Sequence, residues 1–207
     1  MMSRSIRKHW KPIIFSLSIL IFITITYLLL KEQIHIFDNF IFSGIEKLRC
    51  EPLTIVFKVI TFFCSTEFLL IATISIMLFS KKKKNSFYIA LNVLLCFLLN
   101  QGLKHIFLRT RPEDINLIVQ GGYSFPSGHS MLSLAFYGFF IYLIAHMRIK
   151  KSKKYLYCSL LALLTLLIGI SRIYLGVHYA SDVLAGFAMS MAYLIIYIKV
   201  VYKKMES

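Results

Sequence analysis

Two residues near the end of the chain have the types and spacing of a nucleophile and the group that orients it. His178 and Asp182 lie four residues apart. If a helix has begun by His178, both side chains share one helix face, and the carboxylate can accept a hydrogen bond from one ring nitrogen. The other ring nitrogen is then left unprotonated and able to attack an electrophile, which is the logic of a histidine oriented by an acid.

A second histidine follows a segment suited to bind an anion. The run Pro126-Ser127-Gly128-His129 leads into an apolar stretch, so a helix is expected to start at Pro126, with Ser127 and Gly128 in its first turn. Free backbone N–H groups at a helix start bind anions. Ser127 adds a hydroxyl donor, and His129 can donate a proton near neutral pH. An ordinary helix cap explains the serine but not the histidine.

Three cations accompany these segments. Lys104 and Arg111 lie seven residues apart, at the start of a connection between apolar stretches, and Arg172 precedes His178 by six residues. Cations at a membrane edge often do no more than anchor the protein to lipid head groups. Three cations, two histidines and an aspartate at the same ends of neighbouring spans, however, are expected to converge on an anionic ligand, because their burial requires compensation.

Together, the three segments resemble the signature of the type 2 phosphatidic acid phosphatase superfamily. The matching patterns are Lys104-x6-Arg111-Pro112, Pro126-Ser127-Gly128-His129 and Ser171-Arg172-x5-His178-x3-Asp182, without a departure. They occupy 104–112, 126–129 and 171–182, and the six-span layout extends the resemblance to a single domain over 1–207.

The resemblance implies a phosphatase that hydrolyses a lipid phosphate or diphosphate without a metal. It implies that His178 attacks phosphorus to form a phosphohistidine, that Asp182 orients His178, and that His129 protonates the leaving oxygen before activating water. His129 would also complete a phosphate cradle, whose other implied members are Lys104, Arg111, Ser127, Gly128 and Arg172.

The sequence shows no carboxylate cluster suited to Mg²⁺, no Cys and His set with zinc spacing and no Walker-type glycine loop. We therefore expect no metal and no other cofactor, and we infer no obligate protein partner. Gly121-Gly-Tyr-Ser-Phe before Pro126, together with the small size, resembles bacterial phosphatidylglycerophosphate phosphatases that also act on undecaprenyl diphosphate. The two lipids remain alternatives at this point.

The elements that must position these residues are membrane-spanning helices. Hydrophobic residues make up 58% of the 207 residues, well above the usage of soluble domains. A span needs about 20 mostly apolar residues, and six stretches come close to that length, roughly 12–30, 54–80, 86–103, 128–147, 155–172 and 178–198. The predicted fold class is an all-α, polytopic membrane protein with six transmembrane helices.

The net charge of +15 is a topology signal. A nucleic-acid partner requires basic residues gathered on one exposed face. Here they form four blocks, which all lie on one side of a six-span chain: Arg4 to Lys11, Lys81 to Lys84, Arg148 to Lys154 and Lys199 to Lys204. The positive-inside rule assigns that side to the cytoplasm. We therefore predict cytoplasmic termini, a multi-pass cell-membrane location, an active site on the extracytoplasmic side and no nucleic-acid partner.

Two further features have open roles. Phe37, Phe40, Ile41, Ile45 and Leu48 recur at helical spacing within 35–50, which predicts an amphipathic helix in the interface, either a gate for lipid entry or a simple connector. Glu67 lies within the second span, where we expect it to face the bundle interior and find a polar partner. Its candidate partners are Asn92, Asn100 and Gln101.

Three other functions compete with the phosphatase. A vanadate-dependent haloperoxidase has a similar signature, but those enzymes are soluble. A transporter or channel also places charged residues in its spans, but no repeated halves and no broken helices are apparent here. A catalytically silent lipid-binding relative is expected to have lost His129, His178 or Asp182, and none is lost.

Overall fold

A computed structural model describes residues 4–112 and 115–206, with side chains for 10–112 and 115–201. The described residues form helices and no strand, which confirms the all-α prediction. In chain order the helices are α1 (Arg4–Leu30), α2 (His35–Glu46), α3 (Glu51–Phe62), α4 (Thr66–Phe79), α5 (Lys83–Phe107), α6 (Gly128–His146), α7 (Lys151–Tyr174) and α8 (Ala180–Glu206). The terminal basic side chains Arg4, Arg7, Lys8, Lys203 and Lys204 lie outside the described part.

Five helices, α1, α5, α6, α7 and α8, are long and apolar enough to cross a membrane, which makes the chain a multi-pass membrane protein. The remaining predicted span, 54–80, corresponds to the pair α3 and α4, which is bent by 41° at a short break. The expectation that no span is broken was therefore wrong. Six spans are obtained only when this bent pair is counted as one.

The break between α3 and α4 is stabilised by local hydrogen bonds. The Ser65 side chain caps α4 by accepting from the N–H of Phe68, 3.1 Å away. The Phe63 carbonyl accepts from the hydroxyl of Tyr137 on α6, so this backbone group is not left unsatisfied inside the membrane. The bend leaves Thr61, at the end of α3, in contact with Arg172 of α7.

Glu67 follows the same break and corrects a second expectation. It lies in the first turn of α4 and is exposed, rather than facing the bundle interior. A carboxylate is favoured there by the free N–H groups of the helix start. Asn92 instead donates to the Ala135 carbonyl and Asn100 to the Pro126 carbonyl.

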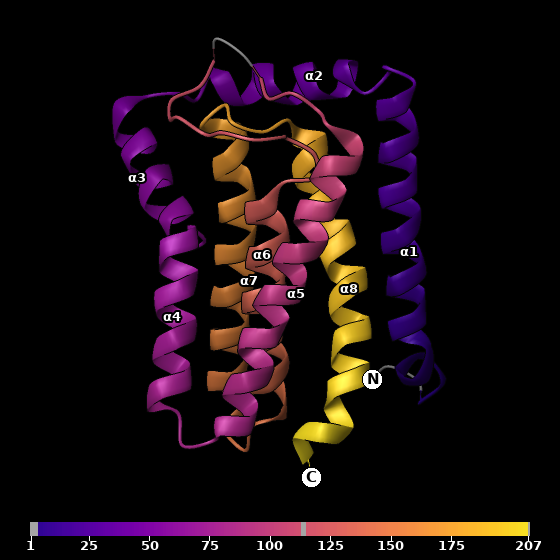
Figure 1. The fold of residues 1–207 in the computed structure, drawn as a ribbon, viewed down its shortest axis with the longest axis vertical. Helices are drawn as coiled ribbons and strands as arrows, with labels where there is room; N and C mark the ends of the chain where they lie inside the picture. The colour runs from indigo at the N-terminus through magenta and orange to yellow at the C-terminus, as the bar shows by residue number, and fades with distance from the viewer. Residues whose placement is uncertain (1–3, 113–114, 207) are drawn as a thin grey trace.

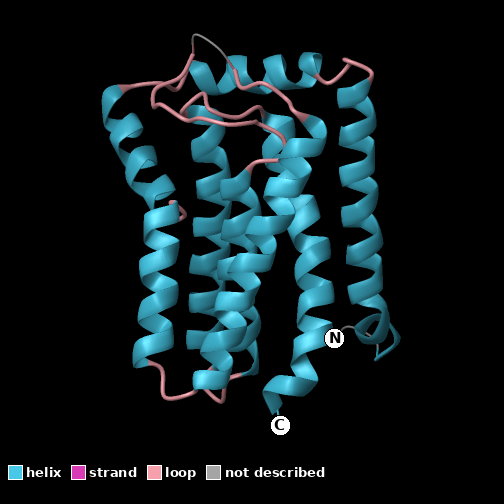
Figure 2. Ribbon diagram, in the orientation of Figure 1, coloured by secondary structure: helices cyan, strands magenta, loops and turns pink. Residues whose placement is uncertain are grey.

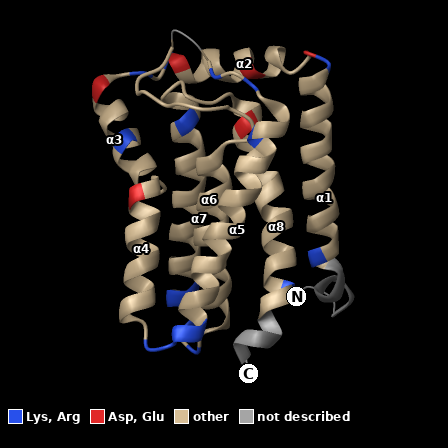
Figure 3. Ribbon diagram, in the orientation of Figure 1, with Lys and Arg blue, Asp and Glu red and all other residues tan. Residues whose placement is uncertain are grey.

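The helices run up and down, so the chain starts and finishes at one end of the bundle (Figure 1). The lysines and arginines of 81–84 and 148–154 lie at that same end (Figure 3). The described parts of the predicted outward connections, 31–53, 104–127 and 173–177, lie at the opposite end. This arrangement agrees with the predicted grouping of loops, while the side of the membrane on which each end lies stays a prediction.

Helix α2 lies across the end that holds the long loops, almost perpendicular to the spans (Figures 1 and 2). Its apolar positions are divided between two faces. Ile41 and Ile45 pack with Phe42 against α7 and α8, whereas Phe37 and Phe40 are exposed, as is Leu48 just after the helix. The predicted helix is therefore present as α2, and only part of its apolar positions pack on the protein.

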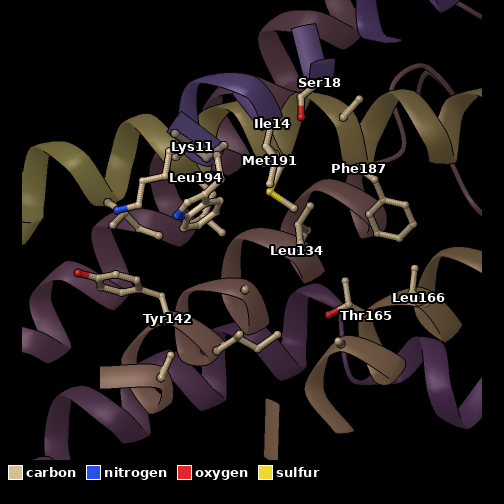
Figure 4. A pocket seen from close by; sticks show the side chains of 18 of the residues that line it. Lys11, Ile14, Ser18, Leu134, Tyr142, Thr165, Leu166, Phe187, Met191 and Leu194 are labelled. Carbon is tan, nitrogen blue, oxygen red and sulfur yellow. The ribbon is translucent and has the colours of Figure 1, made fainter. Parts of the chain in front are cut away.

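A cavity of about 820 Å³ lies between α1, α6, α7 and α8 (Figure 4). Its lining is mostly apolar and includes Leu134, Phe187 and Met191, with Lys11 and Tyr142 towards one end. No residue of the three sequence segments lines it, so this cavity is separate from the candidate site.

Candidate active site

The three segments meet where α5 ends, α6 begins and α7 turns into α8, beneath α2 (Figure 1). Lys104 had been expected to begin the following loop, but it belongs to the last turn of α5. Ser127 is the N-cap of α6 and precedes its first turn. These two placements shift the predicted boundaries by a few residues and leave the side chains at the same end of the bundle.

His178 precedes α8, which begins at Ala180, so the premise that one helix contains both His178 and Asp182 was wrong. The pair nevertheless meets, with His178 Nδ1 3.4 Å from Asp182 Oδ2. The tight turn from α7 makes this possible, because the N–H groups of Val177 and His178 both donate to the Arg172 carbonyl. Gly176 has φ of +74° in this turn, and a Cβ there would overlap the Ile115 carbonyl oxygen.

The protonation of His178 follows from its neighbours. Arg111 Nη1 lies 3.0 Å from His178 Nε2, and because a guanidinium can only donate, Nε2 must be the acceptor. In the neutral ring Nδ1 then holds the proton and faces Asp182 and the Ser124 hydroxyl, which is 3.2 Å away. Burial lowers the pKa of His178 to about 3 although Asp182 acts to raise it, so the ring is neutral at physiological pH.

Asp182 is completely buried and is held on both oxygens. Its Oδ2 accepts from the Ser124 hydroxyl at 2.5 Å and from the Tyr179 N–H at 2.9 Å. Its Oδ1 accepts from Arg109 Nη1 at 2.7 Å. The carboxylate is therefore fixed in place, and Ser124 bridges it to the histidine.

The two arginines of the predicted cradle are held differently. Arg111 donates to backbone carbonyls, including Val177 at 2.6 Å and Gly122 at 2.9 Å. Burial lowers the pKa of Arg111, and Asp182 offsets part of this effect. Arg172 is almost fully buried and donates to Thr61 Oγ1 and Gln120 Oε1, both at 2.8 Å. Its Nε has no hydrogen-bond partner among the described protein atoms, which leaves a donor for a ligand.

Lys104 and His129 lie close to these groups without being fixed by them. Lys104 is buried and interacts electrostatically with Arg111, Arg172 and Asp182. His129 interacts electrostatically with Arg172, His178, Lys104 and Arg111. Among the described residues, neither the Lys104 ammonium nor the His129 ring has a hydrogen-bond partner, so both are available to a ligand.

The start of α6 is packed tightly against its neighbours. Ser127 Oγ accepts from the N–H of Ser130 at 3.4 Å and from its hydroxyl at 3.0 Å, so the Ser127 proton is not used in either bond. A Cβ on Gly128 would lie 3.0 Å from Asn100 Oδ1. A side chain at position 128 would therefore crowd Asn100 of α5 as well as any phosphate at the helix start.

The described residues hold no group of three or more His, Cys, Asp or Glu side chains that could bind a metal ion. Five residues that the sequence analysis did not predict also bond to one another or to Arg172 and Asp182 in the site: Asp38, Thr61, Arg109, Gln120 and Ser124. Asp38 could have been found from the sequence. It lies three residues before Ile41 and four before Phe42, and this spacing puts it on the packed face of α2. An acid on that face is expected to have a buried partner.

The fold and the site define a helical membrane protein in which three cations and a helix N terminus lie at the same end of the bundle as an oriented histidine. The pattern of the PAP2 superfamily matches residues 85–206, more than half of the chain, and the chain belongs to this superfamily. The resemblance inferred from the three segments is thereby confirmed.

Phosphatidylglycerophosphatase B of Bacillus subtilis (strain 168) is 42% identical over 96 residues, which are 45% of this chain and 47% of that relative. The match thus spans about half the length of the relative. The solved structure of a transmembrane PAP2 type phosphatidylglycerolphosphate phosphatase from Bacillus subtilis is similar with a TM-score of 0.79 and 26% identity, over 94% of this chain and 97% of that one. Aquifex aeolicus LpxE gives a TM-score of 0.61 and 29% identity, over 77% and 93% of the two chains.

Proposed function

We propose that this chain is a membrane lipid phosphatase that releases phosphate from a lipid phosphate or diphosphate through a phosphohistidine at His178. The observation that supports this most is the geometry of the His178 ring. Its Nδ1 faces Asp182 and Ser124, while its unprotonated Nε2 faces Arg111, a cation of the predicted phosphate cradle. A phosphate held by Arg111 therefore meets the nucleophilic nitrogen.

In the first step, Arg111 donates to the bound phosphate in place of His178 Nε2. The freed Nε2 lone pair forms a bond to phosphorus, and the bond from phosphorus to the lipid oxygen breaks. Asp182 stabilises the positive charge that develops on the ring. His129 gives a proton to the leaving oxygen. Lys104, Arg111 and Arg172 balance the charge on the phosphoryl oxygens, with donors from Ser127 and the backbone at Gly128.

In the second step, His129 takes a proton from water, and the water oxygen attacks phosphorus. The bond from phosphorus to His178 Nε2 breaks, which releases inorganic phosphate and restores the neutral histidine. Two displacements at one phosphorus thus return every group to its starting state. The cations stabilise the phosphoryl charge in both steps, so we expect activity to need no metal ion.

The bend in α3 and α4 removes one of the sequence arguments against a transporter, because broken helices are common in transporter sites. Here, however, the break supports the phosphatase site, since it leaves Thr61 as a partner of Arg172. The freed carbonyl of Phe63 is bound by Tyr137 and does not line an ion path. The phosphatase therefore remains the favoured function.

Two substrates are favoured by different observations. The name of the Bacillus subtilis relative favours phosphatidylglycerophosphate. An outward site favours undecaprenyl diphosphate, because this carrier lipid must be recycled on that side during wall synthesis. Phosphate release by the purified protein from both lipids and from phosphatidic acid, at equal surface concentration, gives the ratios of kcat/KM that define the substrate. No release from any of the three would contradict the proposal.

The same assay tests the proposed chemistry. Activity should survive excess EDTA, and vanadate should inhibit because it mimics the five-coordinate phosphorus next to His178. Inhibition by EDTA that added Mg²⁺ reverses would refute the proposed mechanism.

The proposed outward location of the site has a separate test. Cysteines introduced near Asp38 and near Asn116 should react with an impermeant thiol reagent in intact cells, whereas one near Lys82 should not. The reverse pattern would place the site on the cytoplasmic side, and would favour phosphatidylglycerophosphate as the substrate.

A further inference from the structure

An acid that belongs to none of the three segments is buried beside the site. Asp38 of α2 has 2% of its surface exposed. Its Oδ1 accepts from the N–H of Ser181, in the first turn of α8, at 2.8 Å. Its Oδ2 accepts from the Ser181 hydroxyl and from Arg109 Nη2, both at 2.8 Å. Asp38 therefore caps the helix on which Asp182 lies.

Arg109 connects Asp38 to Asp182. Its guanidinium donates to Asp182 through Nη1 at 2.7 Å and to Asp38 through Nη2 at 2.8 Å. Nη1 also donates to the Ser181 hydroxyl at 2.8 Å, and the guanidinium carbon lies 4.0 Å from the centre of the Tyr179 ring. Such a planar fork held by two carboxylates and an aromatic face has little freedom to rotate.

The charges of this group have a consequence for His178. With both carboxylates ionised, Asp38, Arg109 and Asp182 together have a net charge of −1. If Asp38 were neutral, Arg109 would balance Asp182 alone, and the group behind His178 would have no net charge. Less negative charge would then face the ring when it becomes positive during attack on phosphorus.

We infer that Asp38 is a positioning residue for the phosphatase reaction, which acts through Arg109 to hold Asp182 in place and to keep it negative towards His178. Helix α2 then completes the active site in addition to covering it. This inference rests on the proposed function, because its consequence for rate requires His178 to be the nucleophile.

The test compares Asp38→Asn with wild type in full-length protein in lipid nanodiscs, with phosphatidylglycerophosphate and undecaprenyl diphosphate as substrates. Asparagine keeps the shape and an acceptor for Ser181 but removes the charge. We expect kcat to fall about tenfold to a hundredfold, the range found when outer partners of metal-bound histidines are changed. KM should change little, because no contact joins Asp38 to Lys104, Arg111 or Arg172. Glu46→Gln, an exposed acid on the same helix, is the matched control and should behave as wild type.

A double-mutant cycle separates positioning from a general effect on the fold. In an Asp182→Asn background, Asp38→Asn should cost almost nothing further, because the group through which it acts is already neutral. Wild-type kcat in Asp38→Asn, or the same loss in both backgrounds, would overturn the inference. If Asp38→Asn does not fold, Arg109→Lys replaces it, since lysine keeps the charge but cannot bridge two carboxylates as a fork. A wild-type kcat for Arg109→Lys would count equally against the inference.

A readout that needs no turnover distinguishes this inference from the proposed function. Nitrogen-15 spectra of labelled histidine, with the His178 signals assigned through a His178→Gln variant, report which ring nitrogen holds the proton. Wild type should show His178 protonated at Nδ1, and Asp38→Asn should shift or divide that signal while Glu46→Gln leaves it unchanged. An unchanged signal in Asp38→Asn contradicts the inference even if the wild-type protein releases phosphate normally. A changed signal supports it even if no lipid tested is hydrolysed.

Discussion

The two sides of the candidate site differ in how completely their polar groups are paired. On the α8 side, both ring nitrogens of His178 and both oxygens of Asp182 have protein partners. On the side formed by α5, α6 and α7, Lys104 and the His129 ring have no hydrogen bond to described residues, and the Nε of Arg172 is unpaired. The nucleophile is thus held in advance, whereas the phosphate cradle keeps donors for its ligand.

This difference matches what each side must do in the proposed reaction. A nucleophile is effective only when its geometry is fixed before the substrate arrives. Cations that bind phosphate, in contrast, contribute most when their donors are not already used by the protein. Substitutions on the α8 side should therefore lower kcat, and those on the cradle side should act on binding or on the leaving group.

The largest effect should come from His178→Ala, which removes the nucleophile from the paired side. Turnover should fall by about a millionfold, the scale seen when the nucleophile of a serine protease is removed. No phosphoenzyme should form, because no other side chain in the cradle is placed to attack phosphorus. Steady-state release of phosphate measures the first effect, and gel filtration verifies that the variant is folded. Residual activity within a hundredfold of wild type would contradict the assignment.

Asp182→Asn should have the next largest effect, a loss in kcat of about ten-thousandfold. The histidine keeps its place but loses the acceptor that favours a proton on Nδ1 and balances its charge. Phosphohistidine should still form, at a reduced rate that rapid quenching can resolve. A loss confined to KM would mean that Asp182 acts on substrate binding and not on His178.

His129→Ala changes a residue on the side of the site whose polar groups are unpaired, and the loss of activity should depend on the leaving group. For a lipid alkoxide, which needs a proton to leave, the loss should be about a hundredfold to ten-thousandfold. For a nitrophenyl phosphate or a lipid diphosphate, whose leaving groups need little help, the loss should be smaller. Equal losses for all three substrates would remove His129 as the general acid.

The smallest effect concerns stability and the low pKa of His178. The folded protein keeps this ring neutral down to about pH 3, whereas the unfolded chain takes up a proton near 6.5. Between these values the unfolded state binds more protons, so stability falls as the pH is lowered, by up to about 1.4 kcal/mol per pH unit from this group. The Tm of wild type should therefore drop more between pH 7 and pH 4.5 than that of His178→Gln. If the Tm of the two proteins fell equally with pH, the lowered pKa of His178 would be contradicted.

Much of the fold and of the candidate site could be predicted from the sequence. Long apolar stretches set the spans, and the basic loops set which connections share an end, because both signals are local in the chain. The residues of the three segments are brought to the same end of the bundle, as their positions beside the spans implied. The roles assigned to them stay proposals.

The residues that were missed share one property, which is a partner far away in the chain. Asp38 is 143 residues from Ser181, and Thr61 is 111 residues from Arg172. Helical spacing could indicate that Asp38 needs a buried partner, but no local pattern identifies the partner, since it depends on how α2 and the bent α3 pack on the bundle. The break at 63–65 was missed because it contains neither proline nor glycine, and because the polar residues beside it, Ser65, Thr66 and Glu67, lie within a long apolar stretch.

The most direct test of the account is to identify the residue that holds the phosphoryl group during turnover. Wild-type protein is mixed with lipid substrate labelled in the transferred phosphate, the reaction is quenched while the intermediate is populated, and the modified peptide is identified by mass spectrometry under conditions that preserve phosphohistidine. We expect phosphate on His178 and none on His129. Phosphate on His129, or hydrolysis by wild type without any trapped phosphohistidine, would contradict it.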